Sequence, residues 1–196
     1  MKFLIGLGLA LIAAFGGWLC YSRMNEMNGI PVRSATVLAD IAPNTKVVVY
    51  GGLWAGDGDG LQVFVSETER CTTSIRTTGK LVSTSTSCHW DETGRNTPQF
   101  DVICDNAPVH ISNQGYSITG ANRYQETGWR TRLRGFSNGD GVLAIGVSTK
   151  NGIQASEIYG GTLAQYVSGL RFWMWAWIVI SGICFVGGIV AEVLAV

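Results

Sequence analysis

Histidine and cysteine side chains in the middle of the chain are the residues best suited to metal chemistry. The sequence of 196 residues contains His89 and His110 together with Cys71, Cys88 and Cys104 in this region. Imidazole nitrogens and thiolate sulfurs are the usual protein ligands of zinc. Zinc sites that can be recognised from sequence bring their ligands in closely spaced pairs such as C-x-x-C, and no such pair occurs here. We therefore expect no metal and no cofactor.

The same three cysteines allow a disulfide bond instead. In an oxidising compartment two of them could pair and leave the third free. The sequence does not indicate which two would pair, and three unpaired cysteines are the alternative. The outcome depends on the compartment that this part of the chain faces.

The sequence gives little indication of acid–base catalysis or nucleotide binding. Neither a P-loop nor a G-x-G-x-x-G pattern is present. The acidic pair Asp91 and Glu92 lies in a polar run that is predicted to be a loop, without visible apolar walls that would raise a carboxyl pKa for acid catalysis. We expect no catalytic residue. The alternative is a metal-assisted hydrolase that uses His89, His110 and a nearby cysteine or carboxylate.

The densest basic run, RYQETGWRTRLRG at residues 123–135, suggests binding instead. If this run is a strand, Arg130, Arg132 and Arg134 share one face, because successive side chains of a strand alternate. Guanidinium groups next to an indole ring such as that of Trp129 can contact lipid phosphates or an acidic partner. The alternative is a solvated strand edge that charge protects. We predict these four residues as the lipid- or partner-binding surface.

The overall charge argues against a nucleic-acid partner. The chain has 14 basic and 14 acidic residues, so its formal net charge is zero. Proteins that bind phosphate backbones usually show a strong basic excess or a basic stripe. We expect partners among membrane lipids and membrane proteins, including a second copy of this chain.

An uncharged apolar segment at residues 172–191 predicts a membrane-spanning helix. A hydrocarbon core of about 30 Å needs about 20 helical residues. Arg171 precedes the segment, where its side chain can reach the headgroups. Trp173, Trp175 and Trp177 crowd the same end, and tryptophan prefers the interface. We predict these four residues as membrane-interface anchors.

A second uncharged apolar segment occupies residues 3–21. It has the basic start and the small-x-small step at residues 14–16 of a signal peptide, which is the alternative. The apolar run continues through Trp18 and Leu19, and this favours an uncleaved anchor.

Small residues at a spacing of four predict helix packing. They are Gly6, Ala10 and Ala14 in the first segment, and Cys184 and Gly188 in the second. Small faces let helices approach closely in lipid. The two helices could pack on each other or on the helices of a partner, although glycine and alanine are common in membrane helices anyway.

Two spans put both ends of the chain on one side of the membrane. Lys2 favours an inside N-terminus, whereas Arg23, Arg33 and Arg171 flank the middle domain and favour the opposite. Long domains are translocated largely regardless of charge. We expect the ends inside and the domain on the outer side, extracytoplasmic or intermembrane.

The region between the two segments is predicted to be rich in β-strands. Alternating apolar residues and turn signals indicate strands at residues 45–53, 60–69, 99–105, 107–112 and 141–149, with an Asp-Asn turn between the third and the fourth. The polar run at residues 83–97 is predicted to be an exposed loop.

We therefore expect a mainly β membrane protein, with two transmembrane helices flanking a small OB-like β-barrel or sandwich. The expected order is a transmembrane helix at residues 1–22, a linker at 23–44, a β-rich domain at 45–153, a connecting helix at 154–171 and a second transmembrane helix at 172–196.

This order of parts, with a few short motifs, resembles the GIDE-type family of membrane ubiquitin ligases and its "beside a membrane" domain. The matching positions over about residues 45–195 are Trp90, Phe100 with Asp105, Tyr124 with Glu126, and Gly139-Asp140 with Val142 and Gly146. Ligase activity in that family lies in a RING after the second helix. The sequence as given has no RING ligand set, so we do not expect that activity.

What the resemblance leaves is a tethered domain that binds something near the bilayer. We expect a non-catalytic, membrane-anchored binding or accessory subunit. Its β domain would lie beside the bilayer and contact partner membrane proteins or lipid headgroups.

Overall fold

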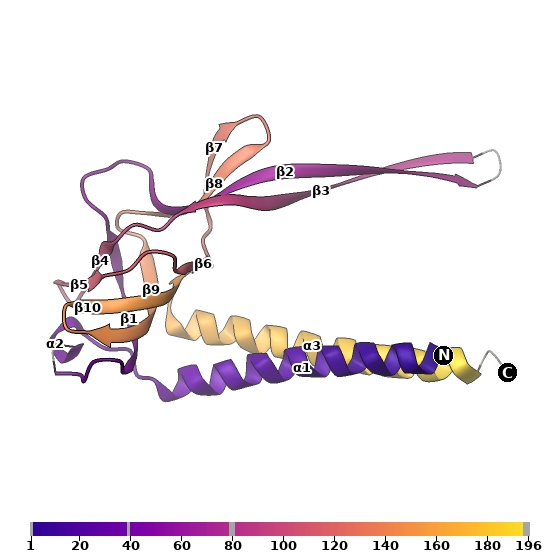
Figure 1. Ribbon diagram of the computed structural model, residues 1–196, viewed down its shortest axis with the longest axis horizontal. Coiled ribbons are helices and arrows are strands. Elements are labelled where there is room, and N and C mark those ends of the chain that lie inside the picture. The colour runs from indigo at the N-terminus through magenta and orange to yellow at the C-terminus, as the bar shows by residue number, and fades with distance from the viewer. Residues whose placement is uncertain (1, 39, 79–80, 194–196) are drawn as a thin grey trace. The chain divides into compact units, whose positions relative to one another are not determined.

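The chain folds as two compact units joined at two points. The first unit contains the two ends of the chain, up to Pro31 and from Thr162, and the second contains Val32–Gly161. Long helices form the first unit and β-strands form most of the second (Figure 1). This confirms the predicted order of helix, β-rich domain and helix. The computed structural model describes residues 2–38, 40–78 and 81–193.

The helical unit is an antiparallel pair of α1, Lys2–Gly29, and α3, Leu163–Val193. Both helices are long and apolar enough to cross a membrane. The first continues to Gly29, through residues predicted to be linker. A capping box starts the second, because the Thr162 hydroxyl accepts from the Gln165 backbone N–H and the Gln165 side chain accepts from the Thr162 N–H.

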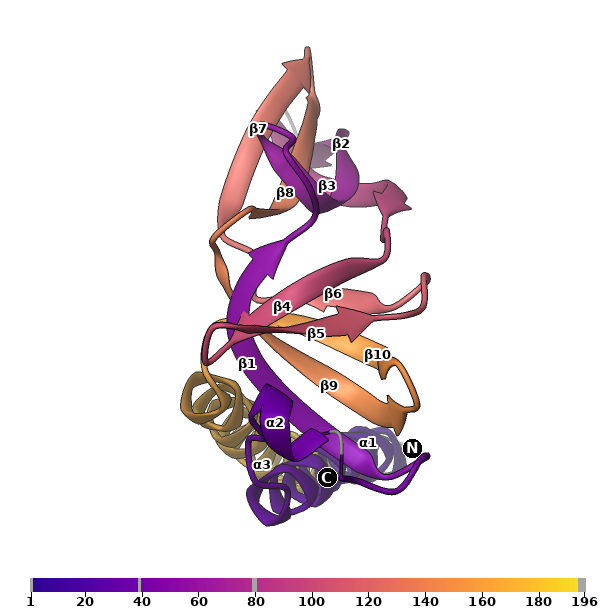
Figure 2. The same cartoon turned by 90° about the vertical axis from the view of Figure 1, so that its left-hand side faces the viewer.

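Five strands of the second unit form a barrel-like sheet. Neighbours are antiparallel in the order β5, β4, β1, β9 and β10, and a parallel pairing of β10 with β5 closes the ring (Figure 2). The strands are β1 Lys46–Trp54, β4 Phe100–Cys104, β5 Ala107–Ile111, β9 Gly141–Thr149 and β10 Gly152–Gly160. Gly152 lies so close to the His110 carbonyl that a side chain would collide with it, and its φ of 141° also favours glycine.

Short elements complete this sheet and its surroundings. After β5 the chain forms β6, Ser117–Thr119, which pairs in parallel with the end of β10. The one-turn helix α2, Ala35–Leu38, packs Ala35 and Leu38 against the core. The predicted Asp-Asn turn is confirmed, because Asp105 and Asn106 both have positive φ between β4 and β5.

A second sheet has the order β3, β2, β8 and β7, with the bounds β2 Leu61–Thr78, β3 Leu81–Asn96, β7 Arg123–Gly128 and β8 Thr131–Ser137. The buried side chains of Val63, Val65 and Phe136 join its base to the single core of the barrel. Pairing of β2 with β8 stops at Thr68 and Thr131. Beyond Thr68, β2 and β3 continue as a two-stranded ribbon (Figure 1).

Two sequence predictions are wrong in this domain. Residues 83–97 are not a loop, because almost all of them belong to β3 and pair with β2. The connecting helix predicted at 154–171 is wrong over its first part, which belongs to β10, Gly152–Gly160, whereas its second part is helical because α3 begins at Leu163. A bulge between Ala155 and Glu157 explains the second error. It moves the next buried residue to Ile158, and this spacing resembles that of a helix.

Candidate functional site

A buried carboxylate organises the arginines that the sequence analysis selected. Glu67 is 7% exposed on β2. Arg132 donates from Nε to one carboxylate oxygen of Glu67 at 2.8 Å, and Arg134 donates from Nε to the other at 2.7 Å. Antiparallel register places Arg132 opposite Glu67 and Arg134 opposite the neighbouring Val65. Both arginines therefore lie on one face of β8 and satisfy a single anion.

Aromatic rings enclose Arg132 on two sides. Its guanidinium carbon lies 3.9 Å from the centre of the Trp90 ring and 4.5 Å from that of Tyr124. A cation over an aromatic face is attracted by the ring quadrupole, more strongly where water is excluded. Arg132 thus connects β3, β8, β2 and β7 across the sheet. We call Glu67, Arg132, Arg134, Trp90 and Tyr124 the Glu67 cluster.

Opposing effects set the ionisation of Glu67. Burial alone would raise the pKa of this carboxyl, but the hydrogen bonds and charges of Arg134 and Arg132 lower it below its usual 4.5. Glu67 is therefore ionised at neutral pH, as two guanidinium partners require. The cluster is a satisfied ion network that holds four strands together.

Trp129 and Arg130 have a different environment from the other two arginines. They form the turn between β7 and β8, where Arg130 has a φ of 59°. Trp129 is 84% exposed, and the Arg130 guanidinium lies 4.3 Å from the centre of its ring. Arg130 Nε also lies 3.7 Å from a carboxylate oxygen of Glu69. Of the four predicted contact residues, these two present the more accessible surface.

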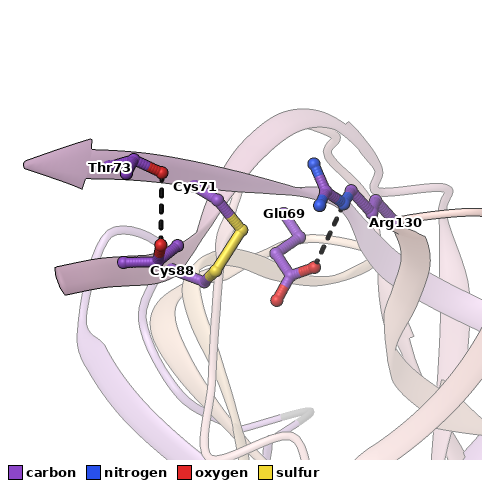
Figure 3. Close-up of a disulfide and its surroundings, with 6 residues drawn as sticks. Glu69, Cys71, Thr73, Cys88 and Arg130 are labelled. Carbon is purple, nitrogen blue, oxygen red and sulfur yellow. Dashed lines mark hydrogen bonds and ion pairs between the residues drawn. A yellow bond between two sulfur atoms is a disulfide. The ribbon is translucent and has the colours of Figure 1, made fainter. Parts of the chain in front are cut away.

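A disulfide joins the two strands of the ribbon. Cys71 and Cys88 lie directly opposite each other on β2 and β3 and are bonded (Figure 3). The next rung on that face carries a hydrogen bond of 3.2 Å between the hydroxyls of Thr73 and Thr86. Cys104 is buried in the barrel and free. The sequence left this pairing open, because it depends on the strand register.

Metal ligands come together at one place in the described part of the chain. Side-chain atoms of Glu69, Cys71 and Cys88 lie within 4.8 Å of one another. The two sulfurs bond each other, however, and Glu69 faces Arg130 (Figure 3). These residues therefore do not suit a metal while the disulfide is intact.

The histidines lie on different strands, each beside an aspartate. His110 Nδ1 is 2.8 Å from Asp101 Oδ1 across β4 and β5, and His89 Nε2 is 3.3 Å from Asp91 Oδ1. Within residues 2–38, 40–78 and 81–193, neither histidine belongs to a group of three possible metal ligands. The hydrolase alternative stays a prediction from the sequence.

A recess of about 390 Å³ lies beside His110. Its lining includes Asp101, His110, Lys150 and Thr149, with Ala35 and Leu38 of α2. The Thr149 hydroxyl is buried and has no hydrogen-bond partner among the described residues. The recess combines a histidine–aspartate pair with a lysine, but its charges of both signs indicate no particular ligand class.

One serine fits a hydrolase pattern in sequence but not in structure. Residues 135–139, GFSNG, match G-x-S-x-G. Hydrolases place this serine on a sharp turn from a strand to a helix. Ser137 instead ends β8, and the following turn leads into β9. Its backbone N–H donates to a carboxylate oxygen of Asp140 at 2.8 Å, which shapes an ordinary strand connection.

Small residues bring α1 and α3 together. A Cβ atom on Gly6 would lie 2.8 Å from the Gly188 Cα and 3.0 Å from the Cys184 carbonyl oxygen, which a glycine alone accommodates. Farther along, the Ser181 hydroxyl donates to the Ala10 carbonyl at 2.9 Å. Ala14 is exposed and lines an apolar groove of about 430 Å³ between the helices.

The predicted interface anchors separate into two groups. Trp177 faces α1, where its ring lies over Gly16. Arg171, Trp173 and Trp175 are exposed on α3. One of the three tryptophans therefore serves the packing of the helix pair, and the other two project from it.

Comparisons of this chain with protein-family models, curated proteins and solved structures found no match. The resemblance to the GIDE-type family stays a prediction that rests on the sequence motifs alone. The two features that sequence reasoning missed are Glu67 and the ribbon. The pairing of Glu67 with two arginines of another strand leaves no signal in the neighbouring sequence. The alternating Ser and Thr residues of β3, by contrast, are compatible with a strand.

Proposed function

We propose that this chain is a non-catalytic, membrane-anchored binding or accessory subunit, with α1 and α3 spanning a bilayer. The outward faces of the helix pair support this. Leu4, Phe15, Phe172 and Ile183 are each more than half exposed, and only 6% of the most apolar stretch of α3 is buried. Each fully buried large apolar side chain gains about 1.5–3 kcal/mol over an exposed one. Lipid would provide that burial.

The disulfide supports placing the β domain on the oxidising side of the membrane. Disulfides form and persist in secreted, periplasmic and similar compartments, and are rare in the cytosol. Both ends of the domain connect to the helices through very short segments, at residues 30–31 and 161–162. Such short tethers would keep the domain beside the bilayer, facing lipid headgroups and membrane-protein partners.

The strand order supports an OB-like classification of the barrel. OB folds are five-stranded Greek-key barrels that bind ligands through loops, including the connection between their first two strands. In this ring, β9 and β10 return to lie between β1 and β5, and β5 pairs in parallel with β10. The connection between β1 and β4, the first two barrel strands, contains the ribbon.

A single observation carries the binding role, namely the ribbon beyond Thr68. It is joined by a disulfide and pairs with no further strand in the described ranges. An isolated two-stranded hairpin is marginally stable in water. A covalently reinforced ribbon with open edges is therefore better explained as a contact element than as part of the core. Trp129 adds an exposed aromatic side chain to the same sheet.

Membrane fractionation and protease protection test whether the chain is anchored in the membrane and on which side the β domain lies. We expect the full chain to stay in the pellet after alkaline carbonate extraction. Protease added to sealed vesicles of known orientation should cut within Val32–Gly161 when the oxidising side faces out and not when it faces in. Release of the chain by carbonate would refute the membrane anchoring. Cleavage only when the oxidising side faces in would refute the placement of the β domain on the oxidising side.

Mild detergent extraction, followed by mass analysis of the purified particle, tests the binding role. We expect a stoichiometric protein partner or a homo-oligomer, and we expect the double variant Trp129→Ala and Arg130→Ala to weaken this association. A strictly monomeric particle without bound protein or lipid would refute the role.

A further inference from the structure

The outer edge of β3 offers unpaired backbone groups. Among the described strands β3 pairs with β2 alone. The Cα atoms of Cys71 and Cys88 are 4.0 Å apart, which identifies a non-hydrogen-bonded rung of an antiparallel pair. Rungs alternate, so the N–H and C=O groups of Cys88, Thr86 and Thr84 point away from β2, toward the open edge.

The usual protection against edge pairing is missing along this stretch. Natural sheets protect their edges with lysine, proline, bulges or charge. Residues 83–88 contain none of these, and all of them are exposed. The irregularity in the pairing of β2 with β3 lies farther along, between Glu92 and Gly94. An extended strand can therefore approach these residues without meeting a charged side chain.

The sequence of this edge reads the same in both directions. Residues 83–87 are Ser-Thr-Ser-Thr-Ser, symmetric about Ser85. An antiparallel pair of two such strands about a two-fold axis at Ser85 places serine opposite serine and threonine opposite threonine. Cross-strand threonine and serine pairs are favourable.

We propose that the β3 edge pairs with the β3 edge of a second copy of this chain, antiparallel and centred on Ser85. Thr84 of each copy then exchanges N–H···O=C bonds with Thr86 of the other, through the groups that point outward. Ser85 lies opposite its own symmetry mate in a non-hydrogen-bonded rung. Two-fold pairing of identical surfaces is the commonest form of homo-oligomer. This inference names a partner for the proposed binding role.

Cysteine crosslinking in the full chain, within its membrane, tests the register. In a background with Cys20→Ser and Cys184→Ser, mild oxidation should link Ser85→Cys into a dimer that reductant separates. Ser83→Cys alone should not link, because its symmetry mate lies about 13 Å away along the strand, beyond the reach of a disulfide. Co-expressed Ser83→Cys and Ser87→Cys chains should link to each other. Equal linking at every position, or none at Ser85→Cys, would overturn the proposal.

Proline substitutions on one rung identify the edge. Thr84 and Ile75 are directly opposite each other, on β3 and β2. Proline at either position removes an outward N–H and leaves the bonds between the two strands intact. Thr84→Pro should abolish the Ser85→Cys crosslink, and Ile75→Pro should preserve it. If both proline variants abolish the Ser85→Cys crosslink, or if neither does, the β3 edge is not the interface. A chain that resists carbonate extraction but fails these tests refutes this inference alone.

Discussion

At the scale of single residues, Glu67 has a structural role that the sequence did not indicate. Its carboxylate is nearly inaccessible to solvent and satisfies Arg132 and Arg134, which the sequence suggested as a binding surface. Removing one partner of a buried ion pair leaves the other charges without compensation. The cluster is therefore a more important determinant of β-domain stability than its exposed neighbour Arg130.

Replacing Glu67 should destabilise the β domain. We expect Glu67→Gln to lower the free energy of unfolding at pH 7 by about 1–3 kcal/mol, because two partly exposed arginines lose their anion. Denaturant unfolding followed by tryptophan fluorescence measures this. Glu69→Gln is the matched control, since its ion pair with Arg130 is longer and more exposed. An equal loss of unfolding free energy in both variants would contradict the stabilising role assigned to Glu67.

The pH dependence of stability should change with the same substitution. The pKa of Glu67 is lowered in the folded protein, so its stabilisation is present above its unfolded pKa and is lost as pH falls through the folded pKa. The difference in unfolding free energy between the wild type and Glu67→Gln should therefore shrink below about pH 4.5. A difference that stays constant from pH 7 to pH 3 would show that Glu67 is not the titrating group.

At the scale of the elements, we expect the ribbon to depend on the disulfide between Cys71 and Cys88, and the helix pair on the close approach at Gly6. Beyond the rung of Glu69 and Trp90, β2 and β3 pair only with each other among the described strands, whereas the barrel strands share one core. Local opening is easiest where few apolar contacts hold the backbone. The two elements are therefore sensitive to different single changes.

Removing the disulfide should loosen the ribbon alone. Closing a loop with a sequence separation of 17 stabilises by about 3 kcal/mol, so the double variant Cys71→Ser and Cys88→Ser should lower amide protection in the ribbon by about 100-fold. Hydrogen exchange with mass spectrometry of peptides from residues 69–78 and 83–90 measures it, with peptides from β9 as the internal control. Comparable loss of protection in β9 would mean that the disulfide supports the whole domain.

A side chain at Gly6 should separate the helices. Gly6→Ile places a Cβ atom against the Gly188 backbone, whereas Gly8 has nothing within 4 Å and is a matched control. We expect Gly6→Ile to destabilise the pair by about 1–3 kcal/mol and Gly8→Ile to change it little. Loss of helical circular dichroism in mixed micelles measures both. Equal effects would show that α1 and α3 do not pack through Gly6.

At the scale of the whole molecule, two compact units share one chain. Gly6 belongs to the unit of helices and Glu67 to the unit of strands, and the contacts described for the two residues have no partner in common. Distant sites without common partners usually have additive effects, within about 0.5 kcal/mol.

We therefore expect the double variant Gly6→Ile and Glu67→Gln to show the sum of the two single losses. Helical dichroism and tryptophan fluorescence, recorded on the same samples, measure the two units separately. A coupling energy well above that margin would indicate that the units stabilise each other.

Local patterns in the sequence were sufficient to predict several helices, strands and turns. The uncharged apolar runs predict α1 and α3, because their extent matches that of a membrane-spanning helix. Period-two alternation predicts β1, the start of β2, β4, β5 and β9. The Asp-Asn turn follows from the tolerance of these residues for positive φ. Each of these signals lies within one contiguous segment of the chain.

The sequence by itself thus determined the order of parts and most barrel strands, whereas the tertiary structure decided the pairings. Cys71 with Cys88, Glu67 with Arg132, and β3 with β2 depend on register between distant segments. Register is set by the shared core and the turns, and a shift of one residue would turn every side chain to the other face. The bulge in β10 and the polar strand β3 misled sequence reasoning for the same reason, because pairing with a neighbouring strand defines both.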